Sequence, residues 1–198
     1  MTSNAPSAGG AARSRTALVV PGIGYTPARP LLHYARAVLE QHGWDVRELW
    51  WEVPGTFQQF TEGERLAWVE RQVVAVIEAE GCGLLVGKSL GTLAAGIAAE
   101  RSLPAVWLTP LLTTEPVLTA LDGCAAPTLL VGGTADPLWD AEAVRRLPHK
   151  ILEFDGADHS LQLPGDAVGS VALLQRLVET MDRFAGGAAH TSGPPEPL

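Results

Sequence analysis

The chain has 198 residues, of which 46% are apolar and 18% charged, and its formal net charge is −8. This length suffices for one hydrophobic core but is short for two domains. The acidic balance excludes nucleic acid and anionic membranes as expected partners, because both are bound through basic patches. No segment approaches the roughly 18 consecutive apolar residues of a membrane span.

The two ends of the chain differ in composition from the part between them. The first residues are rich in Ala, Ser and Gly and lack the apolar segment of a signal peptide, and the last are rich in proline. We therefore predict a disordered lead-in at 1–15, a single domain at 16–185 and a disordered tail at 186–198. Cys82 and Cys124 form no C-x-x-C pair, which favours a reduced, cytoplasmic setting.

Between these ends, short apolar segments typical of strands alternate with amphipathic segments typical of helices. Thr61 and Glu64 have the spacing of a capping box at one helix start, and Gly81 provides its stop. The order predicts an α/β fold, namely a doubly wound, mainly parallel sheet of about six strands with helices on both faces. In chain order the expected elements are strand 17–20, helix 27–42, strand 44–51, helix 61–81, strand 84–86, helix 92–100, strand 105–109, strand 128–131, helix 140–147, strand 150–154 and helix 166–184.

The most informative motif is Gly-Lys-Ser-Leu-Gly at 87–91, where the apolar strand 84–86 turns into a helix of small residues. This is the G-x-S-x-G nucleophile elbow in the setting that it requires. A serine oxygen is a weak nucleophile unless a tight turn exposes it beside a base, and the glycines let strand and helix approach closely. Ser89 is thus the candidate nucleophile, in preference to a plain helix-capping serine.

A carboxylate and a histidine follow in the order that this chemistry needs. Asp136 lies just past strand 128–131, and His159 lies in the loop after strand 150–154. In a parallel sheet with right-handed crossovers these loops emerge at the same edge, so the three side chains can meet. Asp140 is close enough in sequence to replace Asp136 as the acid, and that alternative stays open.

With these three motifs in this order, the chain resembles the α/β-hydrolase superfamily, and specifically its small lidless members of the dienelactone-hydrolase-like kind. The likeness runs from about residue 16 to 184. Two departures stand out: dienelactone hydrolases carry cysteine where this chain has Ser89, and Pro-Gly-Ile-Gly at 21–24 replaces the His-Gly motif of many esterases. Only about 17 residues separate strand 105–109 from strand 128–131, where the superfamily often inserts a cap, so we expect an open site.

The resemblance implies a serine hydrolase that cleaves a small or protruding ester or thioester through an acyl-enzyme. Ser89 would attack, His159 would act as base and then acid, and Asp136 would orient the imidazole. The oxyanion would be bound by the backbone N–H of Leu90 and by a second donor, Ile23 or, failing that, Gly24. The alternative is a non-hydrolytic protein of the same fold, either an acyltransferase or a binding module.

The remaining signals are weaker. Trp51 and Trp139 are candidate substrate-binding residues, although core packing is at least as good an explanation for each. The histidines show no metal-ligand spacing, and no metal or other cofactor is expected; the expected partner is a small acyl substrate. Nucleotide motifs fail, because a P-loop needs glycine where Cys82 stands and a dinucleotide fingerprint needs Gly or Ala where Pro27 stands.

Overall fold

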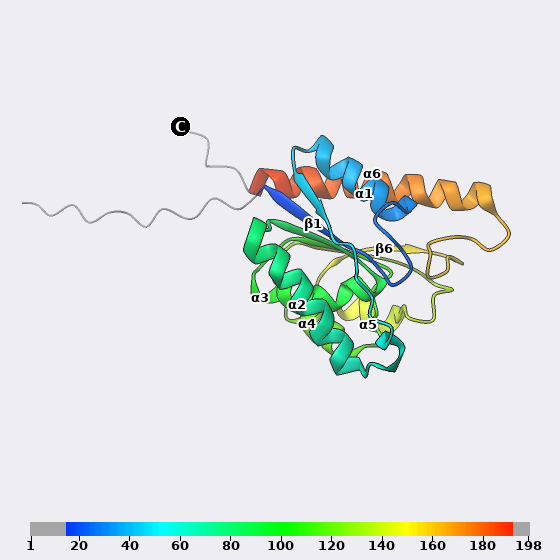
Figure 1. The fold of residues 1–198 in the computed structure, drawn as a ribbon. Helices are drawn as coiled ribbons and strands as arrows, with labels where there is room; N and C mark the ends of the chain where they lie inside the picture. Colours follow the sequence, from blue (N-terminus) through cyan, green and yellow to red (C-terminus); the bar gives the residue numbers. More distant parts are fainter. Residues whose placement is uncertain (1–14, 192–198) are drawn as a thin grey trace, which may run out of the picture.

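The computed structural model describes residues 15–191, which form a three-layer α/β domain (Figure 1). Its six strands make one sheet in the order β2-β1-β3-β4-β5-β6, and every neighbouring pair is parallel. The strands are β1 (Thr16–Val20), β2 (Asp45–Glu48), β3 (Leu84–Lys88), β4 (Ala105–Leu108), β5 (Thr128–Gly133) and β6 (Lys150–Phe154). The helices are α1 (Pro30–Gln41), α2 (Glu62–Glu80), α3 (Ala95–Glu100), α4 (Glu115–Asp122), α5 (Ala141–Arg146) and α6 (Ala167–Thr191), with 3₁₀ turns η1 (Phe57–Gln59) and η2 (Ser89–Ala94).

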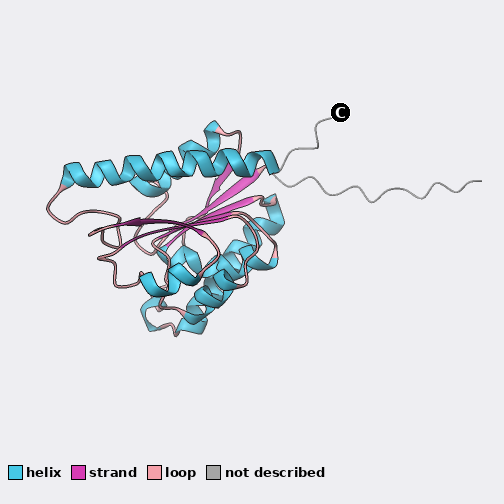
Figure 2. Cartoon of the chain, turned by 180° about the vertical axis from the view of Figure 1, so that it is seen from behind, coloured by secondary structure: helices cyan, strands magenta, loops and turns pink. Residues whose placement is uncertain are grey.

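Helices cover both faces of the sheet, as the sequence predicts. Helices α1 and α6 lie side by side on one face, and α2, α3, α4 and α5 lie on the other (Figures 1 and 2). The period-two alternation of β3 divides the core accordingly, because Leu84 and Val86 pack with α1 and α6 whereas Leu85 packs with α2 and α3. Both faces of the central strands are therefore apolar, which accounts for their near-continuous hydrophobic sequences.

The position of β1 determines where a site can form. From β1 the chain crosses to β2 on one side and then returns to β3 on the other. In open parallel sheets such a reversal leaves a crevice outside the carboxyl ends of the two diverging strands, where ligands bind. The loop at 21–25 and the segment beginning at Ser89 lie at this point of the sheet.

The helix starts and stops follow from local chemistry. The Thr61 hydroxyl accepts from the Glu64 backbone N–H at 3.3 Å, and the Glu64 carboxylate accepts from the Thr61 N–H at 2.7 Å. This is the predicted capping box, which satisfies two backbone donors at the start of α2. Gly81 ends α2 with φ of 76°, a backbone conformation that glycine adopts without strain.

Three features differ from the prediction. Helix α4 lies in the interval between β4 and β5 where no element was expected, and among the described residues that interval holds no cap domain. Strand β2 is confined to Asp45–Glu48. Helix α6 passes the proposed boundary at 185 and continues to Thr191, because Ala185 and Ala188 are buried against the core and outweigh the glycines between them. The remainder of the predicted lead-in and tail, 1–14 and 192–198, lies outside the described residues.

Candidate active site

Ser89 occupies a sharp turn between β3 and η2. Its φ is 50°, in the left-handed region that a non-glycine residue seldom adopts. The two motif glycines allow this turn: a Cβ atom on Gly87 would overlap the Trp107 ring, and one on Gly91 would overlap the Val20 carbonyl. Neither position has room for a side chain, so the sequence prediction of close strand-to-helix approach is confirmed.

The Thr92 side chain stabilises the turn through two hydrogen bonds. Its buried hydroxyl donates to the Ser89 carbonyl oxygen at 2.7 Å and accepts from the Leu111 backbone N–H at 3.2 Å. The helix expected from Thr92 therefore begins as the 3₁₀ turn η2, and regular α-helix starts only at Ala95. The Thr92 hydroxyl thus joins the carbonyl group of Ser89 to the segment after β4.

The structure brings the three candidate catalytic side chains into one hydrogen-bonded row. His159 Nε2 lies 2.8 Å from Ser89 Oγ, and His159 Nδ1 lies 2.7 Å from Asp136 Oδ2. The Asp136 side chain is fully buried, whereas His159 and Ser89 are partly exposed. The carboxylate is therefore the buried end of the row.

The structure decides between the two candidate acids. Asp136 binds His159 through one oxygen and accepts the Leu138 backbone N–H through the other, at 2.9 Å. Asp140 instead caps α5, where its carboxylate accepts from the N–H groups of Glu142 and Ala143. Asp136, and not Asp140, is therefore the carboxylate in contact with the histidine.

Lys88 is the residue of this region that the sequence analysis overlooked. Its side chain is 2% exposed, and Nζ lies 3.1 Å from both Thr109 Oγ1 and the His159 carbonyl oxygen. Nζ also lies 4.6 Å from the centre of the Tyr25 ring. Burial lowers the pKa of Lys88 to about 8, against a smaller upward effect of the carboxylates of Asp136 and Asp158. The alternation of β3 was a usable signal, since it puts Lys88 on the same face as Val86.

The loop after β1 passes directly beside the nucleophile. A Cβ atom on Gly22 would lie 3.2 Å from Ser89 Cβ, so the loop backbone runs against the elbow at this residue. Ile23 and Gly24, the candidate second oxyanion donors, follow immediately, and the chain reverses at Gly24, whose φ is 67°, so that Tyr25 pairs with Gly22.

The two candidate substrate-binding tryptophans lie in different environments. Trp51 is half-buried, stacks on Trp68 with ring centres 4.8 Å apart, and donates its indole N–H to the Pro21 carbonyl at 3.0 Å. Trp139 is only 7% exposed; its ring covers Gly132 and its N–H donates to Glu153 at 2.7 Å. Trp139 thus serves core packing and offers little surface to a ligand, whereas Trp51 borders the loop beside Ser89.

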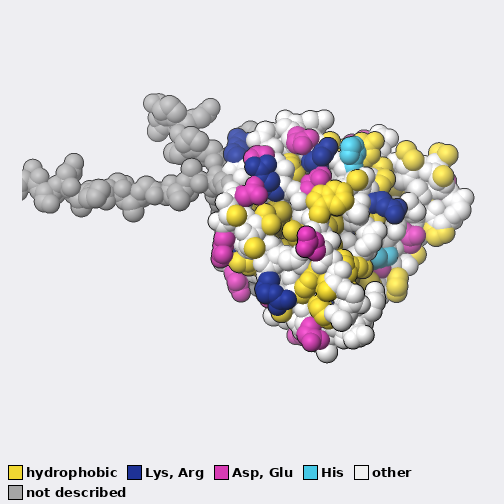
Figure 3. All heavy atoms as spheres, viewed as in Figure 1, with side chains coloured by type: hydrophobic (Ala, Val, Ile, Leu, Met, Phe, Trp, Pro, Cys, Tyr) yellow, Lys and Arg dark blue, Asp and Glu magenta, His cyan; other side chains and the backbone are white. Residues whose placement is uncertain are grey.

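An open cavity of about 570 Å³ lies next to the row of three side chains. It is bounded by the loop after β6, the start of α1 and the first turns of α6, and its lining includes Tyr25, Asp158 and Ser160. Ser89 and His159 are not among its lining residues. Hydrophobic side chains also gather on the surface around the start of α6 (Figure 3), where Val168 is strongly exposed.

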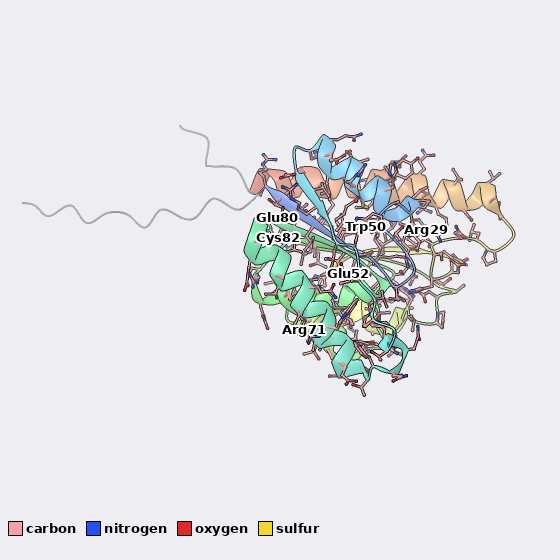
Figure 4. All side chains as sticks on the ribbon, viewed as in Figure 1. Arg29, Trp50, Glu52, Arg71, Glu80 and Cys82 are labelled. Atoms are coloured by element: carbon pink, nitrogen blue, oxygen red, sulfur yellow. The ribbon has the colours of Figure 1, made fainter. Side chains whose placement is uncertain are left out.

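Other reactive groups of the described chain lie elsewhere. Cys82 precedes β3 and sits at the opposite end of the strands from Arg29 and Trp50 (Figure 4), and burial raises the pKa of its thiol to about 11. Within residues 15–191, no three His, Cys, Asp or Glu side chains group as metal ligands. In the same range no helix is both long and apolar enough to cross a bilayer.

No protein-family model and no curated protein matches this chain in sequence. Solved structures do match. An α/β serine hydrolase homologue from Coxiella burnetii has 16% identity and a TM-score of 0.63, over 86% of this chain and 85% of that one. A lidless α/β serine hydrolase from Xanthomonas campestris has 16% identity and a TM-score of 0.57, over 94% of this chain and 86% of that one. A monoacylglycerol lipase from Paleococcus ferrophilus has 16% identity and a TM-score of 0.64, over 87% of this chain and 96% of that one.

These similarities agree with the sheet and its layers described above. The protein has the α/β-hydrolase fold, in a form without a cap domain among the described residues. Fold alone does not fix activity, which depends on the residues of the site.

Proposed function

We propose that the protein is a serine hydrolase that cleaves a carboxylic ester or thioester through an acyl-enzyme intermediate. The observation that supports this most directly is the row formed by the buried Asp136, His159 and the partly exposed Ser89, with hydrogen bonds of 2.7 and 2.8 Å. A nucleophile, a base in contact with it and a carboxylate behind the base are the parts that acyl transfer needs.

In the first half-reaction, His159 Nε2 accepts the Ser89 hydroxyl proton as Oγ forms a bond to the acyl carbon. The carbonyl oxygen of the substrate becomes the oxyanion. As this intermediate collapses, the bond to the leaving group breaks, and His159 returns the proton to the departing alcohol or thiol. Asp136 keeps Nδ1 protonated and balances the charge of the imidazolium. In the second half-reaction, water takes the place of the hydroxyl and the acid is released.

The oxyanion requires two backbone donors on the same side of Ser89. We assign the first to Leu90, whose N–H follows the nucleophile at the start of η2. We assign the second to Ile23, with Gly24 as the alternative, because the adjacent Gly22 lies against the elbow. Each donor is expected to contribute roughly 10² to 10³ in kcat.

The substrate class follows from the open edge of the sheet. Nothing among the described residues covers Ser89 in the way that a cap would, so the site suits a small ester or one that protrudes from a larger molecule. The structural neighbours named as a serine hydrolase and a lipase are consistent with ester chemistry. A strong preference for long, fully buried acyl chains would count against this assignment.

The decisive experiment is labelling of the purified protein with a fluorophosphonate, followed by mass spectrometry of the peptide that contains Ser89. We expect a single adduct on Ser89, its absence in Ser89→Ala, and a rate at least 10³-fold lower in His159→Ala. Labelling that survives Ser89→Ala would refute the assignment. Absence of any adduct on the wild-type protein would instead favour a binding module of the same fold.

A further inference from the structure

Lys88 is a buried cation in the first position after Gly87 of the elbow motif, and the mechanism above does not use it. Its side chain extends from β3 toward α1 and α6, into the face where Leu84 and Val86 are surrounded by apolar residues. Burying an ammonium group is costly unless nearby groups compensate for the lost hydration. The contacts of Nζ therefore indicate the role of the lysine in the structure.

Those contacts converge from three separate loops. Thr109 follows β4, His159 follows β6 and Tyr25 follows β1, and Nζ binds a hydroxyl, a backbone carbonyl and a ring face, respectively. None of the three carries a negative charge, so this is not an ordinary salt bridge. A single ammonium group joins all three loops to the strand that ends directly before Ser89.

Thr109 is itself held in an unusual conformation. It is fully buried, and its φ of 44° lies in the left-handed region, where β-branched residues are rare. Such strain persists only where surrounding contacts over-determine the backbone. The Thr109 N–H donates to the Val131 carbonyl at 2.7 Å, and Oγ1 accepts from Lys88. The strained residue thus forms part of the support for Lys88.

The histidine loop is also held by hydrogen bonds to the segment after β5, where the Ala135 N–H donates to the Ala157 carbonyl at 3.0 Å and Thr134 Oγ1 accepts from the Gly156 N–H at 2.8 Å, and by bonds within itself. The Asp158 carboxylate accepts from the N–H groups of Ser160 and Gln162, and the Leu161 N–H donates to the Asp158 carbonyl. These bonds shape the turn but do not place it relative to β3. The bond from Lys88 Nζ to the His159 carbonyl places the loop relative to β3, because Lys88 is the residue directly before Ser89.

We propose that Lys88 is a positioning residue that fixes the backbone of His159 relative to Ser89, so that the imidazole reaches both Ser89 Oγ and Asp136. This inference rests on the proposed function, because the imidazole matters for rate only if the row is catalytic. Misplacement of a reacting group by about 1 Å can cost on the order of 10²-fold in rate. Loss of the Lys88 ammonium should therefore lower kcat rather than weaken substrate binding.

The test compares Lys88→Met, which keeps an apolar stem of similar length, with Lys150→Met, which removes the other lysine of the chain at an exposed position. With p-nitrophenyl acetate as probe, we expect Lys88→Met to lower kcat about 10- to 100-fold while KM stays within about twofold. Lys150→Met should match the wild type. Unchanged kcat in a folded Lys88→Met protein would overturn the proposal.

A second measurement does not depend on activity. The proton that His159 Nδ1 donates to Asp136 should give a downfield ¹H NMR signal in the wild type, absent from Asp136→Asn. In Lys88→Met we expect this signal to broaden or vanish while the circular dichroism spectrum stays native. If the wild type proves inactive but the signal responds to Lys88, the hydrolase proposal fails and the positioning role stands. An unaltered signal refutes the positioning role.

Should Lys88→Met fail to fold, Thr109→Val provides the second variant, because it removes one acceptor of Nζ and keeps the side-chain volume. It should lower kcat in the same direction, by a smaller factor, and leave KM unchanged. A folded Thr109→Val protein with wild-type kcat and an unaltered downfield proton would count against the proposal.

Discussion

The indole N–H of Trp51 donates to the carbonyl oxygen of Pro21 at 3.0 Å, which joins the segment after β2 to the loop after β1. Pro21 directly precedes Gly22, whose backbone lies against Ser89. Trp51 therefore touches the loop that carries the proposed second oxyanion donor. It is anchored in turn by stacking on Trp68.

This relationship predicts the effect of Trp51→Phe, which keeps an aromatic ring against Trp68 but removes the hydrogen bond. We expect the free energy of unfolding to fall by about 1 kcal/mol. We also expect kcat to fall more than KM rises, because the loop with the proposed second oxyanion donor loses its hydrogen bond to Trp51. Urea denaturation and ester hydrolysis would measure the two effects. Trp50→Phe is the control, since Trp50 is 55% exposed and should change neither quantity. A loss confined to KM would point to substrate contact instead.

The two aspartates near β5 offer a matched pair of isosteric substitutions. Asp136→Asn removes the carboxylate that fixes the tautomer of His159 in the proposed mechanism, and we expect kcat to fall on the order of 10⁴-fold. Asp140→Asn keeps a good helix cap for α5, so activity should stay at the wild-type level and stability should change by only a few tenths of a kcal/mol. Steady-state kinetics on both variants decide the matter. Equal losses in the two would contradict the assignment of the acid.

Two glycines in consecutive elements should respond oppositely to alanine. A methyl group at Gly91 would overlap the Val20 carbonyl, so Gly91→Ala should destabilise the protein by roughly 1–3 kcal/mol or more. Gly96 lies within α3 with nothing within 4 Å of an added methyl group, so Gly96→Ala should stabilise by about 0.5–1 kcal/mol. Denaturant titration of both proteins measures the difference. A neutral Gly91→Ala would show that the elbow has more room than the structure contains.

The lowered pKa of Lys88 predicts a pH dependence of stability. Between about pH 8 and the ordinary value of 10.5, the unfolded chain holds the Lys88 proton more often than the folded chain does. The free energy of unfolding must then rise with pH, by at most about 1.4 kcal/mol per unit from this group. The groups that face Nζ are Asp136, Asp158 and Tyr25.

The measurement is the difference in unfolding free energy between the wild type and Lys88→Met, taken at pH 7, 8, 9 and 10. We expect this difference to shift in favour of the wild type as pH rises above 8. The pKa of Cys82, raised to about 11, acts in the opposite sense, since stability falls as the unfolded thiol ionises first from about pH 9. That contribution is common to both proteins and cancels. A difference that stays flat would contradict the burial of a charged Lys88.

The sheet and the positions of Ser89, Asp136 and His159 could be predicted because each depends on local signals that agree with one another. Buried parallel strands are continuously apolar, and the candidate residues lie within five residues after strand ends. Helix α4 escaped prediction because it is eight residues long and buries only Val117 and Leu121, too short a pattern to separate from a loop. This helix occupies the interval between β4 and β5, where the described residues hold no cap domain.

Other outcomes required the tertiary structure. The Gly-Gly pair at 186–187 indicates a helix stop, but burial of Ala188 extends α6 beyond it. Trp139 follows Asp136 by three residues, yet the turn points its ring under Gly132 and away from solvent. Whether Lys88 is solvated or buried depends on Thr109 and Tyr25, which the sequence places 21 and 63 positions away. Local patterns contain no information on such partners.

The parallel topology also governs when this site can appear during folding. His159 and Ser89 are 70 residues apart and their loops follow different strands, so no supersecondary unit contains both. Parallel pairings between distant segments form slowly, because the loop-closure entropy opposes them before their contacts form. A partly synthesised or partly folded chain that lacks β6 therefore holds Ser89 on its elbow without His159 beside it. Reactivity at Ser89 should accordingly report completion of the whole sheet, which makes it a direct probe of the native population.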